Sequence, residues 1–307
     1  VTGCGGADRS GSSDVAGPDI DVPQQTASSE EIDGGGNEPK LCSALTASVT
    51  GRVNTGAAKE LSGLVMSRAQ SRVMWTHNDS GDRARVFAVD TKGRLLAEVA
   101  VTGAKAVDWE DIAVSRDAVL VGDIGDNDRR RESIVVYRIA EPRLAPSKSG
   151  SPAKLTAQAS RIELRYPMGP RDAETLLRDP DSGALAIIEK NRMGMAGIFV
   201  ARPSAGGSHM MRRAGALHLG PNQPITGGDI SADGRTIVLR SYDKTFVWRR
   251  EKGESIPDAL DKEHCSGRAD LRLEGIGEAL ALNRDGSAFY TVAEGTNPQI
   301  WRYVPEG

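Results

Sequence analysis

A tetrapeptide built around one aromatic residue recurs five times along the chain, at a spacing of roughly 50 residues. Its β-branched and aromatic residues are typical of strands. The copies are Val86–Val89, Val136–Ile139, Ile198–Ala201, Val247–Arg250 and Ile300–Tyr303. Strand-like repeats of this period indicate an all-β fold of the β-propeller class, in which each repeat forms one blade. Because blades surround a common axis, residues far apart in the chain can form one site.

Each repeat divides into segments with strand-like composition. The predicted strands are 62–66, 72–76, 85–89, 95–101, 111–114, 118–122, 133–139, 161–166, 175–178, 184–188, 197–201, 214–219, 229–231, 236–240, 245–249, 270–273, 278–282, 288–292 and 299–304. Turn signals such as Asp233-Gly234 and Asp285-Gly286 recur between the first two strands of later repeats. Residues 143–160 read as a long loop and 255–263 as a short helix. The sequence therefore predicts five four-stranded blades. Six is the alternative, since the step from Tyr137 to Phe199 has room for further strands.

The last repeat lacks one strand, and a segment near the start of the chain can supply it. Residues 45–53 are β-prone and belong to no repeat. Pairing them with the last blade would close the ring and remove exposed sheet edges. Cys42 then enters the closing strand and Cys265 precedes the last blade, so we expect a Cys42–Cys265 disulfide that clamps the ring. Two buried free thiols are the alternative.

The first forty residues are rich in Gly, Ser, Asp and Glu and contain no aromatic residue. Such a segment cannot bury enough apolar surface to offset its ordering entropy. Val1-Thr2-Gly3-Cys4 resembles the end of a bacterial lipoprotein signal, so we expect lipidation at Cys4. We therefore divide the chain into residues 1–41, a signal remnant and disordered acidic tether, and 42–307, the propeller domain. This arrangement predicts a protein that is secreted or lipid-anchored at the extracellular face of the cell membrane.

Charge and hydrophobic pattern exclude several classes of partner. The net charge is -3 and the pI about 5.9, which gives no electrostatic reason to expect nucleic acid. No apolar run is long enough to span a bilayer, so contact with a membrane would depend on a lipid anchor. We expect a monomer whose propeller mouth binds a small molecule or a protein. The sequence also contains no Gly-x-Ser-x-Gly elbow and no P-loop.

Carboxylates recur where innermost strands begin and where second strands end. In a propeller these positions lie at one mouth of the ring, where Ca²⁺ can take six to eight oxygens with flexible geometry. The predicted metal ligands are Asp108, Glu110, Asp123, Asp126, Asp172, Glu174 and Glu278. Neutralisation by basic residues and backbone N–H groups is the structural alternative. The segment Asp123–Asp128 is the best local calcium loop, because Gly125 permits a sharp turn between its side-chain oxygens. A solvated turn rich in Asp and Asn is equally compatible with it.

Three residues are candidates for binding a substrate at the same mouth. His77 follows a second strand and could contact phosphate or transfer a proton near its ordinary pKa. Lys190 and Arg240 could hold phosphate oxygens through charge-assisted hydrogen bonds. Each also has an ordinary structural interpretation. A single histidine on a loop more often has no functional role, and Lys190 and Arg240 could instead neutralise the carboxylates of the mouth.

Five segments together resemble a group of secreted actinobacterial propeller proteins: Glu60–Leu64, Trp75–Asp82, Asp108–Ala113, Gly122–Asn127 and Arg171–Glu174. The architecture and acidic mouth are more distantly similar to β-propeller phytases and phytase-like esterase domains. That resemblance implies calcium at the mouth, where it would bind and polarise a substrate phosphate, although those enzymes have six blades.

These features suggest two functions. The first is a non-catalytic, exported binding module with a calcium-binding mouth that captures a ligand or partner protein. The second is a calcium-dependent hydrolase of phosphate esters, in which the metal polarises the phosphoryl group and activates water.

Overall fold

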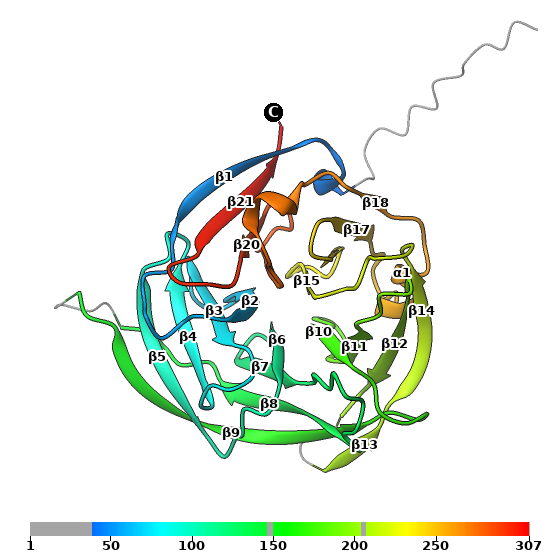
Figure 1. Ribbon diagram of the computed structural model, residues 1–307, viewed down its shortest axis with the longest axis horizontal. Helices are drawn as coiled ribbons and strands as arrows, with labels where there is room; N and C mark the ends of the chain where they lie inside the picture. Colours follow the sequence, from blue (N-terminus) through cyan, green and yellow to red (C-terminus); the bar gives the residue numbers. More distant parts are fainter. Residues whose placement is uncertain (1–38, 146–149, 204–206, 307) are drawn as a thin grey trace, which may run out of the picture. The chain divides into compact units, whose positions relative to one another are not determined.

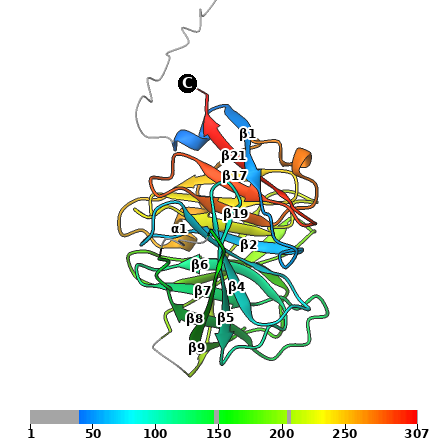
Figure 2. The same ribbon diagram turned by 90° about the vertical axis from the view of Figure 1, so that its left-hand side faces the viewer.

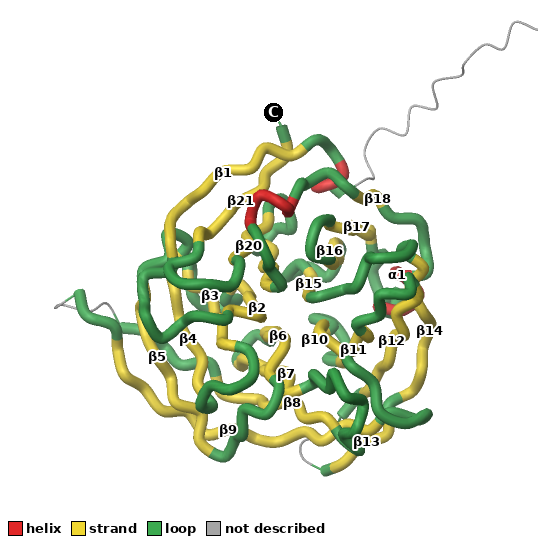
Figure 3. Tube along the Cα trace, in the orientation of Figure 1, coloured by secondary structure: helices red, strands yellow, loops and turns green. Residues whose placement is uncertain are grey.

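The computed structural model of this chain describes residues 39–145, 150–203 and 207–306. The predicted tether and Cys4 lie outside these residues, except that Pro39–Leu41 already belong to the described chain. Strands and loops make up nearly all of it (Figure 3). The exceptions are α1 (Ile256–Leu260) and two 3-10 turns, η1 (Lys40–Cys42) and η2 (Leu271–Glu274). None of the helices in the described ranges has the length and hydrophobicity of a bilayer-spanning segment.

Three sheets have four antiparallel strands each, ordered from the centre outward (Figure 1). One contains β19 (Ala279–Leu282), β20 (Phe289–Val292), β21 (Gln299–Pro305) and β1 (Leu45–Arg52). Another contains β10 (Ala173–Arg178), β11 (Leu185–Glu189), β12 (Met195–Ala201) and β14 (Arg212–His218). The third contains β15 (Gly227–Ile230), β16 (Thr236–Arg240), β17 (Thr245–Arg249) and β18 (Cys265–Ser266).

The fourth sheet joins two such antiparallel runs side by side. The first run contains β2 (Leu61–Met66), β3 (Val73–Asn78), β4 (Arg85–Asp90) and β5 (Leu95–Thr102). The second contains β6 (Trp109–Val114), β7 (Ala118–Asp123), β8 (Ile134–Ala140) and β9 (Ala153–Arg165), and β13 (Ser208–Met210) adds to β9. The runs join because the first half of β9 pairs in parallel with β5, while its second half pairs with β8.

The innermost strands β2, β6, β10, β15 and β19 contact one another in cyclic order. Apolar clusters fill the space between each pair of neighbouring runs. Trp75 and Trp109, for example, pack in one cluster between the first two runs. Strands covered on both faces bury nearly every side chain, and β3, β6 and β7 are buried throughout. This all-β architecture is that of a β-propeller.

The predicted closing strand is present. β1 pairs antiparallel with β21, from Leu45 opposite Pro305 to Arg52 opposite Gln299 (Figure 2). The Thr50 hydroxyl donates to the backbone oxygen of Thr91, in the turn between β4 and β5, at 2.7 Å. Gly51 lies against that same turn, where a Cβ atom would come within 1.9 Å of a backbone oxygen. The closing strand therefore belongs to the last sheet and packs on the first run.

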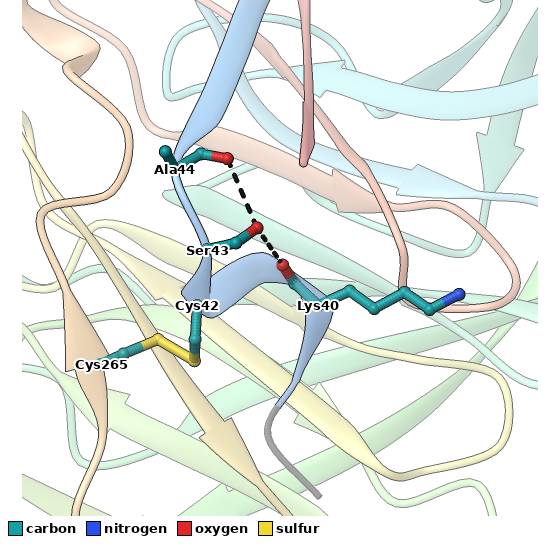
Figure 4. Close-up of a disulfide and its surroundings, with 5 residues drawn as sticks. All are labelled: Lys40, Cys42, Ser43, Ala44 and Cys265. Atoms are coloured by element: carbon teal, nitrogen blue, oxygen red, sulfur yellow. Dashed lines mark hydrogen bonds between the residues drawn. A yellow bond between two sulfur atoms is a disulfide. The ribbon is translucent and has the colours of Figure 1, made fainter. Parts of the chain in front are cut away.

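The predicted disulfide is also present. Cys42 and Cys265 are bonded, and their positions are 223 residues apart in the sequence (Figure 4). Cys265 begins β18, which pairs with β17, whereas Cys42 ends the turn that leads into β1. The bond thus joins two neighbouring sheets at the point where the ring closes. It indicates an oxidising, extracellular environment.

Two predicted elements are wrong. Residues 153–160 were expected in a loop, but they form the first half of β9. They alternate between exposed and half-buried positions and find a partner in β5, which the pattern of a single repeat does not anticipate. The outer strand expected at 270–273 is instead the 3-10 turn η2, because Cys265 and Ser266 pair with β17. The predicted helix is confirmed as α1, with Ser255 as its N-cap.

Two buried aspartates connect neighbouring innermost strands. Asp111 on β6 accepts a hydrogen bond from the backbone N–H of Leu176 on β10 at 2.8 Å. Asp229 on β15 accepts one from Leu282 on β19 at 2.9 Å. Burial raises the pKa of both carboxyl groups, that of Asp229 to about 7. These two side chains therefore have a structural role. Their hydrogen bonds to backbone N–H groups match the structural alternative given in the sequence analysis for carboxylates where innermost strands begin.

Removing the disulfide tests its contribution to ring closure. In the chain-entropy account, a cross-link over so long a loop stabilises the folded state by about 5 kcal/mol, and measured values of about 2–4 kcal/mol are typical. We expect the free energy of unfolding of the double variant Cys42→Ser/Cys265→Ser, measured by urea denaturation, to be lower than that of the wild type by about 2–5 kcal/mol. A loss below about 1 kcal/mol would contradict the clamp, since few natural disulfides contribute so little.

The raised pKa of Asp229 predicts a pH dependence of stability. The folded state keeps the Asp229 proton up to about pH 7, whereas the unfolded chain releases it near 3.8. Between these values the folded state binds more protons, so its stability falls as pH rises, by up to about 4 kcal/mol for this group. We expect Asp229→Asn to reduce the fall in unfolding free energy between pH 4 and 7.5. Equal slopes for the variant, wild type and the exposed control Asp128→Asn would refute this assignment.

Candidate functional site

One end of the ring gathers the loops that lead into innermost strands and the hairpins between second and third strands. We call this end the mouth. Its loops are residues 53–60, 79–84, 103–108, 124–133, 166–172, 190–194, 219–226, 241–244, 267–278 and 293–298. A repeated backbone hydrogen bond aligns them, since a residue after a second strand donates to one just before the innermost strand. The four instances are Asp79 to Glu60 (2.7 Å), Ile124 to Asp108 (3.1 Å), Lys190 to Asp172 (3.0 Å) and Glu294 to Ile276 (3.0 Å).

Three carboxylates from two neighbouring runs converge at the mouth. Asp79, Asp108 and Glu110 each offer one oxygen, and these atoms lie within 4.8 Å of one another. Only 3% of Glu110 is exposed, and in the described part of the chain its carboxylate has no hydrogen bond or ion pair. Burial, together with the charges of Asp79 and Asp108, raises the pKa of Glu110 well above its ordinary value. Burial and the neighbouring carboxylates likewise raise the pKa of Asp108 to about 6. We call these three residues the acidic triad.

Gly125 packs against two members of the triad. A Cβ atom on Gly125 would lie 2.1 Å from Glu110 Oε1 and 2.5 Å from Asp108 Oδ2. The backbone φ of Gly125 is not positive, so the residue is required for close approach and not for a sharp turn. The prediction of a calcium loop assigned a different role to this glycine. Its backbone instead covers one side of the triad.

Next to the triad, Lys190 lies among groups from three sheets. Its ammonium group pairs with Glu174 and lies 3.9 Å from Glu278 Oε1. It is also 5.6 Å from the centroid of the Tyr242 ring, whose hydroxyl donates to Glu278 at 3.3 Å. Glu174 Oε2 is buried without a hydrogen-bond partner. The mouth therefore already binds one ammonium group, but it retains more carboxylates than Lys190 can neutralise.

The other predicted metal ligands do not join the triad. Asp123 pairs with Arg131 at 2.8 Å and accepts a hydrogen bond from the Asp108 backbone at 3.1 Å. Two backbone N–H groups of the same loop donate to Asp126, at 2.8 and 2.9 Å. Asp172 accepts the backbone N–H of Asp126 at 3.1 Å. These carboxylates stabilise the turn at 123–128 and its contact with the next run.

Two of the three predicted substrate-binding residues lie in the interior. His77 is fully buried, with Nδ1 2.9 Å from the Asn78 backbone oxygen and its ring edge-on to Trp109. Burial lowers the pKa of His77 to about 4, so the ring is neutral at physiological pH. Arg240 is fully buried as well and donates to the backbone oxygen of Ala279 at 2.9 Å. Of the three, Lys190 alone reaches the mouth.

Asp79 is the triad member that the predicted ligand set omits. The sequence does carry a signal for it, because the segment Asn78–Asp82 follows a second strand, as the segment Asp123–Asp128 does. Asp82 in that segment pairs with Arg85 at 2.7 Å, which separates its role from that of Asp79.

No protein-family model matches this sequence, and no curated protein matches it. Solved structures match part of the fold. One is the PQQ-bound aldose sugar dehydrogenase of Streptomyces coelicolor, with 13% sequence identity and a TM-score of 0.48, covering 85% of this chain and 98% of that one. Another is U3-55K, with 9% identity and a TM-score of 0.41 over the same shares of the two chains. Similarities this low carry no inference about the site.

Proposed function

We propose that the domain is a five-bladed propeller whose mouth binds a divalent cation, with Ca²⁺ as the best match, and that it acts as a module for capturing a ligand or partner. The observation that carries this proposal is the acidic triad, in which Glu110 is buried and forms no ion pair with the described residues. The five apolar clusters between neighbouring runs support the blade number. The nine-stranded sheet then represents two blades joined by β9.

A cation is the natural complement of the triad. Buried carboxylates in mutual contact cannot all ionise unless a proton or another positive charge neutralises them. An all-oxygen donor set favours hard cations, and Ca²⁺ accepts irregular geometry more readily than Mg²⁺ does. The triad contains neither the nitrogen nor the sulfur ligands typical of zinc sites, since His77 faces Trp109 and the two described cysteines are bonded to each other. Asp79, Asp108 and Glu110 would supply carboxylate oxygens, and water would complete the coordination.

Calorimetric titration of metal-free protein with calcium chloride tests the cation site. We expect saturable binding and a rise in melting temperature, because a ligand at 100 times its Kd stabilises the folded state by about 2.7 kcal/mol. Glu110→Gln should abolish both effects while leaving the protein folded. Heat of binding and melting shift that persist in Glu110→Gln would refute the site.

A matched pair of glycine variants separates cation binding from stability. Gly125→Ala places a methyl group against the Glu110 and Asp108 oxygens, so we expect calcium affinity to fall by about tenfold or more. Gly56→Ala is the control, since a Cβ atom there meets nothing within 4 Å and its φ is not positive. Equal calcium affinities for the two variants, measured in the same calorimeter, would mean that the cation binds elsewhere.

The geometry favours a binding module over a phosphoesterase. Besides the metal, a phosphoesterase of this kind would need basic side chains free to hold the phosphoryl oxygens. Lys190 is occupied by Glu174 and Glu278, whereas His77 and Arg240 are buried in the interior. Release of phosphate from a generic ester or from phytate, lost on adding chelator, would reverse this choice.

We also propose that Cys4 carries the lipid anchor expected from Val1-Thr2-Gly3-Cys4. Support for this comes from the lipoprotein-like motif and from the disulfide, which indicates export. Metabolic labelling with palmitate in a bacterial host, compared with Cys4→Ser, tests the anchor.

A further inference from the structure

Exposed hydrophobic side chains concentrate at the mouth. The described residues include seven large hydrophobic side chains that are exposed, and five of these lie in or next to mouth loops. The five are Val107, Met168, Met193, Met195 and Ile276. Met193 is 87% exposed and Ile276 is 64% exposed. Apolar surface gathered around a polar centre is typical of a protein interaction site.

These side chains come from four separate loops. They precede β6, β10 and β19 or belong to the hairpin between β11 and β12. An occupant that covers several of them must extend across the mouth. A metal ion or a small metabolite cannot do so, whereas a segment of a folded protein can.

Two accessible carboxylates lie beside Ile276. Glu294 donates its backbone N–H to the Ile276 oxygen at 3.0 Å, and Gly295 donates to Lys59 at 2.7 Å, which holds Glu294 near Glu60. In the described part of the chain neither carboxylate has a hydrogen bond or ion pair. Partial burial raises the pKa of Glu294, and the charges of Glu278, Asp79 and Glu60 add to this effect, whereas the charge of Lys190 opposes it. This part of the mouth therefore carries two carboxylates that form no direct ion pair among the described residues.

Charge complementarity decides which kind of partner fits. Lys190 shows that the mouth stabilises an ammonium group between carboxylates and over an aromatic ring. Glu60 and Glu294 supply two further carboxylates, and Lys59, although exposed next to Glu60, forms no ion pair in the described structure. A cation bound by the acidic triad would leave both carboxylates free. A positively charged side chain is thus the complement of this region.

We propose that the mouth binds a partner protein through an exposed segment in which a lysine or arginine is flanked by apolar side chains. The basic group pairs with Glu60 and Glu294, and the apolar flanks cover Ile276 and the other exposed side chains of the mouth loops. This inference rests on the binding role proposed above and specifies the partner. It does not require the cation, because neither glutamate belongs to the acidic triad.

Binding of short labelled peptides to the full chain, followed by fluorescence anisotropy, tests the proposal. The probes share one length and differ only in charge or flanks: Leu-Leu-Lys-Leu-Leu, Leu-Leu-Glu-Leu-Leu and Ser-Ser-Lys-Ser-Ser. We expect the first to bind about tenfold more tightly than either of the others, since each of those lacks one half of the complementarity. Equal affinities, or no binding of the first peptide, would overturn the proposal.

Variants locate the binding to the mouth. Glu60→Gln/Glu294→Gln and Ile276→Ser should each weaken the lysine peptide by about tenfold. Glu263→Gln and Val49→Ser are the controls, because they remove an exposed carboxylate and an exposed apolar side chain away from the mouth loops. Losses of equal size in the controls would refute the assigned surface.

Two further measurements distinguish the alternatives. Sedimentation velocity that shows self-association of the wild type, lost in Ile276→Ser, would make a second copy the occupant and overturn the proposal. Calcium titration of the same proteins tests the cation site separately. Peptide binding without calcium binding would remove the triad's proposed role and leave this one intact, whereas the reverse result would remove only this one.

Discussion

The pairing of β1 with β21 is the interaction on which the mouth depends. It joins the two ends of the described chain, so that the Thr50 hydroxyl contacts the backbone of Ile300, 250 residues away. Without β1, the outer edge of β21 would be left unpaired where the last sheet meets the first run. Glu60 and Glu294 belong to those two units, and the hydrogen bond between Gly295 and Lys59 crosses the same junction. The Cys42–Cys265 bond strengthens the closure from the neighbouring side.

Closure also explains why carboxylates tolerate such crowding. Innermost strands present several acidic side chains to one another, and the structure resolves their repulsion in different ways. Asp111 and Asp229 accept backbone N–H groups from adjacent innermost strands, and Glu174 takes the ammonium group of Lys190. Among the described residues, the Glu110 carboxylate receives neither kind of partner. A buried carboxylate beside two others can ionise only if a positive charge compensates it, and this requirement is the physical basis of the proposed cation site.

Particular residues show how far sequence reasoning extends. The period of the aromatic tetrapeptides and the unassigned segment at 45–53 led to the fold class and to the closing strand. Local pattern could not anticipate β9, because its first half is stabilised by a parallel partner from another repeat. The local pattern also did not show which acidic residues bind within their own loop and which come together at the mouth. Whether backbone N–H groups of its own loop donate to Asp126, or whether Asp108 lies near Glu110, depends on the conformation of loops that the repeat does not constrain.

Residue order alone determined the periodic strand pattern, the disulfide partners and a surplus of acidic residues at equivalent positions of successive repeats. These properties are local or depend on simple pairing, so the sequence specifies them directly. Packing in three dimensions selected Asp79 for the triad, buried His77 and Arg240, and brought Glu60 next to Glu294. Each of these outcomes depends on distances between side chains from different runs, and such distances exist only once the ring has closed.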